Sequence, residues 1–207
     1  MTSALDSDLE GFSLEVSRGN RCLFADLSFR LGRGEMALVT GSNGCGKTSL
    51  LRVLAGLAVP NSGRVMLGKA DIHGFLPEQR RDLVFKGHLN GLKKELTARE
   101  NLEFFYRLWQ GDHQVDTVLA ELQLSPAADY LVRHLSTGQR RRVSLGALRL
   151  QPATLWILDE PLAGLDKSGI DLICGWVREH LQKGGIAVIA THRAEPFSGS
   201  YQLNIEL

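Results

Sequence analysis

Short apolar runs separated by amphipathic segments predict the main elements of this chain. The segments Met36–Thr40, Leu155–Asp159 and Ile186–Ala190 are almost wholly apolar, which is typical of parallel strands buried on both faces. Between the second and the third, Lys167–Gln182 places apolar residues at the spacing of an amphipathic helix. Because parallel neighbours need a crossover connection, usually a helix, this half of the chain predicts an α/β fold with a parallel core sheet.

The N-terminal part of the chain carries a different pattern. Residues 12–16 and 23–31 alternate apolar and polar positions, as half-buried strands do. A further strand, 64–67, follows a Pro-Asn-Ser-Gly turn signal. These strands predict an N-terminal antiparallel β subdomain.

The middle of the chain is expected to be mostly helical. Thr97 and Glu100 have the spacing of a capping box that opens a helix over Ala98–Trp109. A second helix is predicted over 115–122, and a third is expected to end at Pro152, which cannot continue it.

Length and composition fit one globular domain. The chain has 207 residues, of which 43% are hydrophobic and 23% charged, and Lys+Arg (24) nearly equal Asp+Glu (23). We therefore expect a single domain, 1–207, with a core of about 1–87 and 151–207 and a helical subdomain at about 88–150. Without a basic excess, no nucleic-acid partner is expected. The three separated cysteines, Cys22, Cys45 and Cys174, favour a reducing compartment over disulfides or structural zinc.

A glycine-rich segment between a predicted strand and a predicted helix matches the phosphate-binding P-loop, G-x-x-x-x-G-K-[ST]. Its residues are Gly41, Ser42, Asn43, Gly44, Cys45, Gly46, Lys47 and Thr48, with Ser49 following in the expected helix 47–57. Backbone N–H groups of such a loop surround the phosphates of ATP, and Lys47 is expected to contact the β- and γ-phosphates. Thr48 is expected to bind Mg²⁺. We expect the Cys45 thiol to be incidental; the alternative is that its modification blocks nucleotide entry.

Two carboxylates stand where a predicted buried strand ends. Asp159 and Glu160 close the run Leu155–Asp159, and ligands of α/β sheets bind at the carboxyl ends of strands. After a P-loop, this pair is expected to hold Mg²⁺ through Asp159 and to polarise the attacking water through Glu160 as general base. His192, just beyond Ile186–Ala190, is expected to contact the γ-phosphate and act in catalysis with Glu160 and Lys47; the alternative is an ordinary loop histidine.

The segment 135–139, Leu-Ser-Thr-Gly-Gln, precedes the strand with the two carboxylates and resembles the signature motif of ABC ATPases. Ser136 and free N–H groups of Gly138 and Gln139 would form an anion site at the start of a helix. The resemblance implies that this site faces the γ-phosphate held by a second copy of the chain, so that a head-to-tail pair with two-fold symmetry encloses two ATP molecules. The alternative is an ordinary N-capping serine before an Arg-rich surface helix.

A second segment, 161–166, resembles the D-loop of the same family. The resemblance implies that Asp166 lies at the dimer interface and connects the two ATP sites. Asp166 is also expected to cap the helix that follows, and the two interpretations are compatible.

Two positions depart from the ABC pattern. Arg18 stands where many family members stack an aromatic side chain on adenine, and a guanidinium can also stack on a base. His88 stands where the family usually has the glutamine of the Q-loop. His88 is expected to contact the Mg²⁺ and water region or to report nucleotide state; the alternative is a plain loop residue.

The segment 87–102 resembles the G-H-x-x-G-[IL]-K-x-x-L-T-x-x-E-N-L pattern of the ATP-binding subunits of haem exporters in bacterial cytochrome c maturation. The resemblance implies an ATPase that docks on integral membrane subunits at the cytoplasmic face of the bacterial inner membrane. There, hydrolysis drives release of a haem-loaded periplasmic chaperone. No direct haem binding is expected. The alternatives are the ATPase subunit of another small-molecule ABC exporter and an ABC protein without a transport role.

Overall fold

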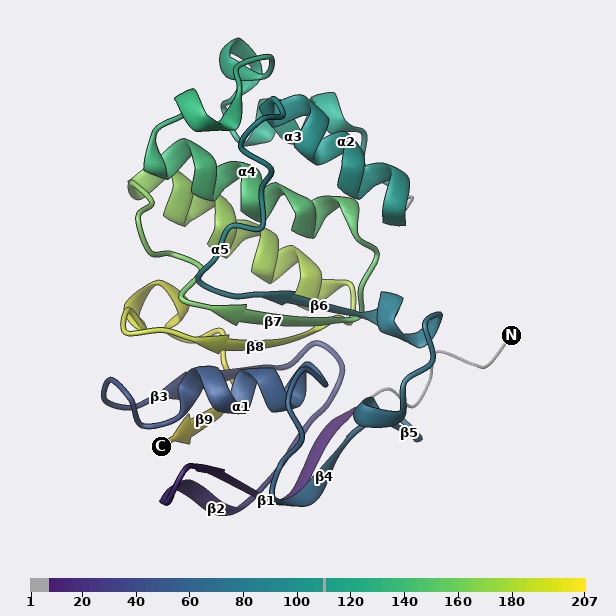
Figure 1. Cartoon of the computed structure of the whole chain (residues 1–207), viewed down its shortest axis with the longest axis vertical. Coiled ribbons are helices and arrows are strands. Elements are labelled where there is room, and N and C mark those ends of the chain that lie inside the picture. The colour runs from purple at the N-terminus through teal and green to yellow at the C-terminus, as the bar shows by residue number, and fades with distance from the viewer. Residues whose placement is uncertain (1–7, 110) are drawn as a thin grey trace.

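The computed structural model describes residues 8–109 and 111–207 (Figure 1). The strands are β1 Leu9–Arg18, β2 Arg21–Leu31, β3 Met36–Thr40, β4 Ser62–Leu67, β5 Ala70–Asp71, β6 Leu83–Lys86, β7 Leu155–Asp159, β8 Ile186–Ala190 and β9 Leu203–Glu206. The α-helices are α1 Lys47–Leu54, α2 Ala98–Trp109, α3 Val115–Glu121, α4 Thr137–Leu150 and α5 Lys167–Gln182.

A five-stranded sheet forms the core, in the order β6-β7-β8-β3-β9, and its paired neighbours run parallel. The predicted parallel core sheet is therefore confirmed. The sequence pattern did not predict β6 and β9, because each has only four residues, which is too short to show a clear pattern. Both are edge strands, where a partner is needed on one side alone.

The second sheet is antiparallel for every pair that its strands form, in the order β2-β1-β4-β5, as predicted for the N-terminal part. Register shifts interrupt the pairing of β1 with both neighbours. Ser13 in β1 and Asp26 in β2 adopt positive φ angles of 42° and 51°. Such irregularities bend a strand and increase its twist, which suits a sheet that wraps over a helix.

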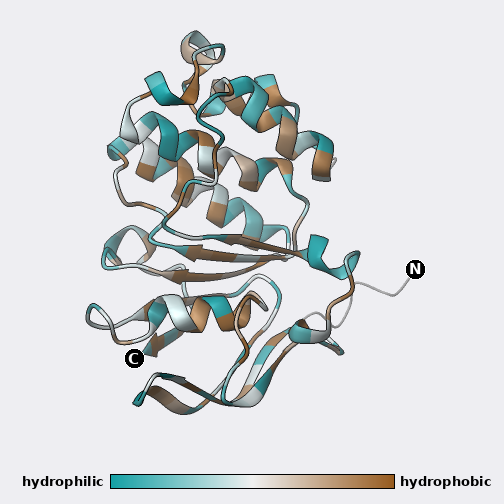
Figure 2. Ribbon diagram, viewed as in Figure 1, coloured by the Kyte–Doolittle hydropathy of each residue, from teal (hydrophilic) through white to brown (hydrophobic). Residues whose placement is uncertain are grey.

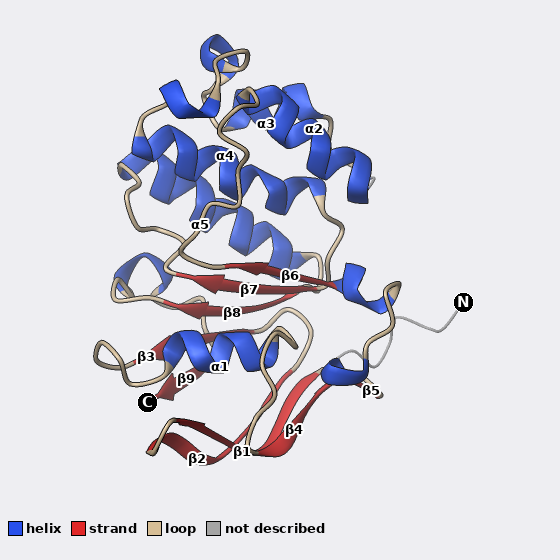
Figure 3. Ribbon diagram, viewed as in Figure 1, coloured by secondary structure: helices blue, strands red, loops and turns tan. Residues whose placement is uncertain are grey.

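The two faces of the parallel sheet are covered differently (Figures 1 and 3). On β7, Trp156 and Leu158 join a core with α2, α3, α4 and α5, whereas Leu155 and Ile157 join a core with α1 and the antiparallel sheet. The strands of this sheet are the hydrophobic centre of the chain in Figure 2. Period-two alternation between two apolar environments explains why the central strands β3, β7 and β8 are apolar at nearly every position. No helix in the two described ranges has the length and apolar character to cross a bilayer.

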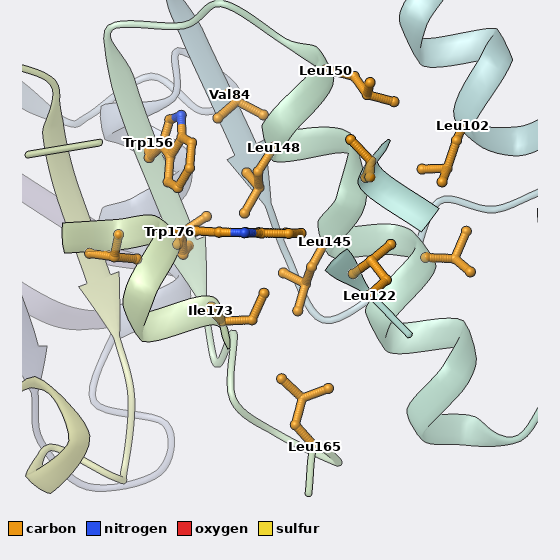
Figure 4. Close-up of a cluster of buried hydrophobic side chains, with 14 of the residues drawn as sticks. Val84, Leu102, Leu122, Leu145, Leu148, Leu150, Trp156, Leu165, Ile173 and Trp176 are labelled. Atoms are coloured by element: carbon orange, nitrogen blue, oxygen red, sulfur yellow. The ribbon is translucent and has the colours of Figure 1, made fainter. Parts of the chain in front are cut away.

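Trp176 of α5 lies at the centre of the core between the helices and the sheet (Figure 4). It is 4% exposed, and the guanidinium carbon of Arg149 lies 5.4 Å from its ring centroid. Trp176→Ala is expected to lower the free energy of unfolding by about 3–5 kcal/mol, because it leaves a large cavity. Urea unfolding measures the change. Tyr130→Ala, at a side chain that is 60% exposed, is the control and should change the stability by less than about 0.5 kcal/mol. Equal losses in the two variants would contradict this view of the core.

Candidate ATP-binding site

The loop between β3 and α1 is shaped by its glycines. Gly41 and Gly46 have φ angles of 137° and 123°, which side chains rarely allow. A Cβ atom at Gly41 would lie 2.5 Å from the carbonyl oxygen of Leu207 and 2.7 Å from the sulfur of Cys45. The Cys45 side chain therefore packs against Gly41. The tight loop ends at Gly46, the N-cap of α1, so the N–H groups of the first turn are directed toward the loop.

Lys47, the first residue of α1, is held by the loop. Its ammonium group donates hydrogen bonds to the carbonyl oxygens of Gly41 at 2.8 Å and Ser42 at 3.0 Å, and the residue is 8% exposed. An ammonium group has three N–H donors, so these two bonds fix the charge and leave a third donor for an anion.

Asp159, at the carboxyl end of β7, joins two other predicted residues. Its Oδ2 atom accepts a hydrogen bond from Thr48 Oγ1 at 2.8 Å, and His88 Nε2 lies 3.4 Å from the same oxygen. The Asp159 side chain is 2% exposed and the His88 side chain 61% exposed. A buried carboxylate is thus fixed beside a hydroxyl group, with an imidazole on the solvent side.

Glu160 is held in an unusual conformation by the loop after β8. Its φ angle is 48°, and its N–H donates to the carbonyl oxygen of Ala190. The carboxylate accepts hydrogen bonds from His192 N–H at 3.0 Å and Thr191 Oγ1 at 3.2 Å. His192 Nε2 lies 3.6 Å from Glu160 Oε1. Two residues predicted to be catalytic therefore contact each other directly.

These groups line one cleft of about 600 Å³. The predicted residues on its wall are Arg18, Asn43, Gly44, Gly46, Lys47, Thr48, Ser49, His88, Asp159, Glu160 and His192. Arg21 and Leu23 also line it, although no motif in the sequence indicated them. Arg18 and Arg21 are opposite each other in the β1–β2 pairing, so the register of this hairpin could have revealed Arg21.

The predicted signature residues line a different pocket, of about 320 Å³. Ser136 is the N-cap of α4, and it forms a capping box with Gln139, whose N–H donates to Ser136 Oγ at 3.1 Å. The expectation of a free Gln139 N–H was therefore wrong, because the capping serine uses that donor. Gly138 and Asp166 line the same pocket.

Asp166 caps α5, as expected, by accepting a hydrogen bond from the N–H of Gly169 at 2.9 Å. It also forms an ion pair with Arg142 of α4. The Gly169 N–H, followed by the Arg142 guanidinium, lowers the pKa of the Asp166 carboxyl group. This ion pair joins the segment after β7 to the helix that begins at Ser136.

A P-loop cleft and a capped helix start in a second pocket, both on one α/β chain, define an ATP-binding domain of the ABC type. A family profile described as "ABC transporter" matches residues 24–163. The "Cytochrome c biogenesis ATP-binding export protein CcmA" of Mannheimia succiniciproducens is 42% identical over 93% of this chain and 91% of that protein. The protein of the same name from Escherichia coli is 43% identical over 89% of both chains. The chain therefore belongs to the CcmA family of ABC transporter ATP-binding proteins.

Solved structures agree with the fold. A structure described as the ATP-binding subunit of an ABC transporter has a TM-score of 0.84 and 24% identity, and the match covers 96% of this chain and 85% of that one. An ATP-binding cassette of an ABC transporter in its ADP conformation has a TM-score of 0.77 and 25% identity, covering 97% of this chain and 87% of that one.

Proposed function

We propose that this chain is the ATP-hydrolysing motor subunit of an ABC transport complex for haem export and cytochrome c biogenesis. The supporting observation is that the P-loop and the signature serine lie in different pockets, since Lys47 and Glu160 line one and Ser136 lines the other. One chain cannot bring both of its pockets onto the same nucleotide. A second copy would supply the missing signature residues. The names of the CcmA relatives supply the transport role.

Nucleotide binding rests on the P-loop. The third N–H donor of Lys47 binds the β- or γ-phosphate. The Cys45 N–H donates to the Ser42 carbonyl oxygen, and Gly41, Ser42 and Cys45 do not line the cleft, so the phosphates are surrounded by the backbone N–H groups of the loop residues that do: Asn43, Gly44, Gly46, Lys47 and Thr48. Arg18 lines the same cleft, and its guanidinium group stacks on the base. Gly44 contributes its backbone where a side chain would obstruct the phosphates.

Thr48 and Asp159 fit a Mg²⁺ ion. They offer a hydroxyl and a carboxylate oxygen 2.8 Å apart, and Mg²⁺ prefers oxygen ligands together with water and phosphate. His88, a nitrogen donor, fits better as a hydrogen-bond partner of Asp159 or of water than as a direct ligand. When bound, Mg²⁺ supplies positive charge that stabilises the transferring phosphoryl group.

Glu160 acts as the general base. Its carboxylate takes a proton from the water that attacks the γ-phosphorus, while the bond between that phosphorus and the β–γ bridging oxygen breaks. The hydrogen bonds from His192 N–H and Thr191 Oγ1 orient the carboxylate for this step. The His192 imidazole, beside Glu160 on the cleft wall, contacts the γ-phosphate.

A second copy completes each site. Ser136 and Gly138 of one chain face the γ-phosphate bound by Lys47 of the other, in a head-to-tail arrangement with two-fold symmetry. Asp166 lies at the same interface, beside the signature residues.

Membrane subunits receive the motor at the cytoplasmic face of the bacterial inner membrane. The region of residues 88–101 docks on them, and hydrolysis drives release of a haem-loaded periplasmic chaperone. The motor itself binds neither haem nor nucleic acid. Co-purification from solubilised membranes, with identification of the associated subunits, tests this assignment; association with subunits of an unrelated exporter would contradict it.

Ser136→Arg tests the proposal that each ATP site is shared between two chains. The long, charged side chain of arginine would block the pocket that Ser136, Gly138 and Gln139 line, called here the signature surface. We therefore expect ATP turnover to be abolished while a single chain still binds ATP. Turnover and equilibrium binding of a fluorescent ATP analogue separate the two effects. Ser198→Arg, at an exposed serine outside both pockets, is the matched control. Undiminished turnover by Ser136→Arg would contradict the shared site.

Mixing Ser136→Arg with Lys47→Ala extends the test. Each variant alone has no intact shared site, but a mixed pair combines one intact P-loop with one intact signature surface. At equal concentrations roughly half of the pairs are mixed and each holds one intact site of two, so turnover of up to about a quarter of wild type is expected, and coupling between the two sites lowers it.

A further inference from the structure

Arg141 of α4 is buried and connects three segments beside the ATP cleft. The residue is 6% exposed. Its Nη2 atom donates to the carbonyl oxygens of Glu160 at 2.8 Å and Asp159 at 3.3 Å. Its Nη1 atom donates to the carbonyl oxygen of Gly87 at 3.1 Å and to Asn90 Oδ1 at 3.4 Å. One guanidinium group thus joins α4, the end of β7 and the loop after β6.

This position is costly for a cation. The four acceptors are uncharged oxygens, and Nε has no hydrogen-bond partner. Burial lowers the pKa of Arg141, although the charges of Asp159 and Glu160 oppose this shift. The pKa of the neighbouring Lys86 falls to about 8, through burial and then through the positive charge of Arg141. Because an apolar residue would avoid this desolvation, stability alone does not account for an arginine here.

The groups that bind Arg141 belong to segments that carry the proposed catalytic and Mg²⁺-binding residues. Glu160 has a positive φ angle, its N–H donates to the Ala190 carbonyl oxygen, and its own carbonyl oxygen accepts from Arg141. The loop 87–90 carries His88, which approaches Asp159, and Ser144 of α4 donates a second bond to this loop, at 2.6 Å, through the Asn90 carbonyl oxygen. A movement of α4 would therefore shift both the Glu160 peptide and the loop of His88.

The same helix begins at the signature surface. Ser136 caps α4, and Arg141 lies five residues later, about 7.5 Å along the helix axis at 1.5 Å per residue. In the proposed pair, Ser136 contacts the nucleotide of the other copy, whereas Arg141 contacts the catalytic residues of its own copy. The rigid first turns of α4 therefore lie between the two ATP sites.

We infer that Arg141 is a positioning residue that ties the signature helix to Glu160 and to the His88 loop, so that engagement of Ser136 by one nucleotide orders the general base at the other. This inference rests on the proposed function and specifies how its two sites communicate. Arg141 acts through the carbonyl oxygens of Asp159 and Glu160 and does not itself line the ATP cleft.

The test compares Arg141→Gln, Arg141→Lys and Arg149→Gln in the full chain. Steady-state kinetics give kcat and KM, a fluorescent ATP analogue gives the dissociation constant of the single chain, and thermal unfolding gives Tm. Arg149 is the matched control, because it is a nearly buried arginine of the same helix that instead pairs with Glu121 and Glu179.

Arg141→Gln is expected to lower kcat about 100-fold with KM and the dissociation constant within about 3-fold, because only the reacting geometry is disturbed. Arg141→Lys should recover about 10-fold of that loss, since it keeps the charge but cannot reach all four acceptors. Arg149→Gln should lower Tm and leave kcat unchanged. If Arg141→Gln fails to fold, Arg141→Lys carries the prediction as a loss of about 10-fold in kcat at unchanged KM.

Two results would overturn the inference. One is a kcat within about twofold of wild type in Arg141→Gln, or in Arg141→Lys where the glutamine variant does not fold. The other is a loss of kcat in Arg149→Gln that has the same ratio to its loss of Tm as in Arg141→Gln. Both arginines would then act only through stability. A failure of the proposed function itself would look different, because the wild-type chain would then neither bind nor hydrolyse ATP.

Discussion

Glu160→Gln is expected to lower ATP turnover by about 10²–10⁴-fold while ATP binding stays intact. The amide keeps the shape of the carboxylate and can still accept the hydrogen bond from His192 N–H, but it cannot take a proton from water. Because hydrolysis is then slow, the ATP-bound pair of chains should accumulate. Steady-state turnover measures the first effect, and light scattering with and without ATP and Mg²⁺ measures the second.

Glu195→Gln is the control for this variant. Glu195 is an exposed carboxylate outside the cleft, so the same chemical change there should leave turnover and assembly as in the wild type. Wild-type turnover by Glu160→Gln would remove Glu160 from the role of general base. A variant that is slow but stays monomeric with ATP would instead contradict the shared site.

Lys47→Ala is expected to weaken ATP binding by about 1.5–3 kcal/mol, or roughly 10–150-fold in dissociation constant. The variant loses the ammonium group that would bind the phosphates, and it also releases the carbonyl oxygens of Gly41 and Ser42 that this group holds. Titration calorimetry with ATP measures the loss. Lys69→Ala, at an exposed lysine outside the cleft, should bind ATP as the wild type does. Unchanged affinity in Lys47→Ala would exclude the P-loop as the phosphate site.

The elements that were predicted from the sequence are those with a strong periodic pattern. β3, β7, β8, α2 and α5 have the predicted bounds, because buried apolar runs, a capping box and an amphipathic stripe mark them clearly. The helix expected over 47–57 ends earlier, at Leu54. β5, β6 and β9 were missed, since two to four residues are too few to show a period. Their pairing depends on partners distant in the chain.

The candidate site was predicted where a residue belongs to a local motif. Lys47, Asp159 and Glu160 belong to segments whose chemistry can be interpreted directly, and the structure places them in one cleft. Their roles remain proposals. The signature serine was expected to face another chain, and the pocket that it lines is separate from that cleft.

Arg141 was missed because its position in the sequence suggests a solvated charge run. Arg140, Arg141 and Arg142 are consecutive, but successive residues of a helix point about 100° apart. Arg140 bonds the Leu135 carbonyl oxygen, Arg142 pairs with Asp166, and Arg141 is buried and bonds the Glu160 carbonyl oxygen. Only the three-dimensional arrangement separates these three roles.

The backbone conformation of Glu160 lowers the stability of the fold at a residue that the proposed reaction needs. A left-handed conformation costs an ordinary residue about 1–2 kcal/mol, which glycine would largely avoid. Yet a side chain with a carboxylate occupies the position, at a φ angle of 48°. The fold would therefore be more stable with glycine at this position. Selection for stability alone would remove the carboxylate that the proposed reaction needs.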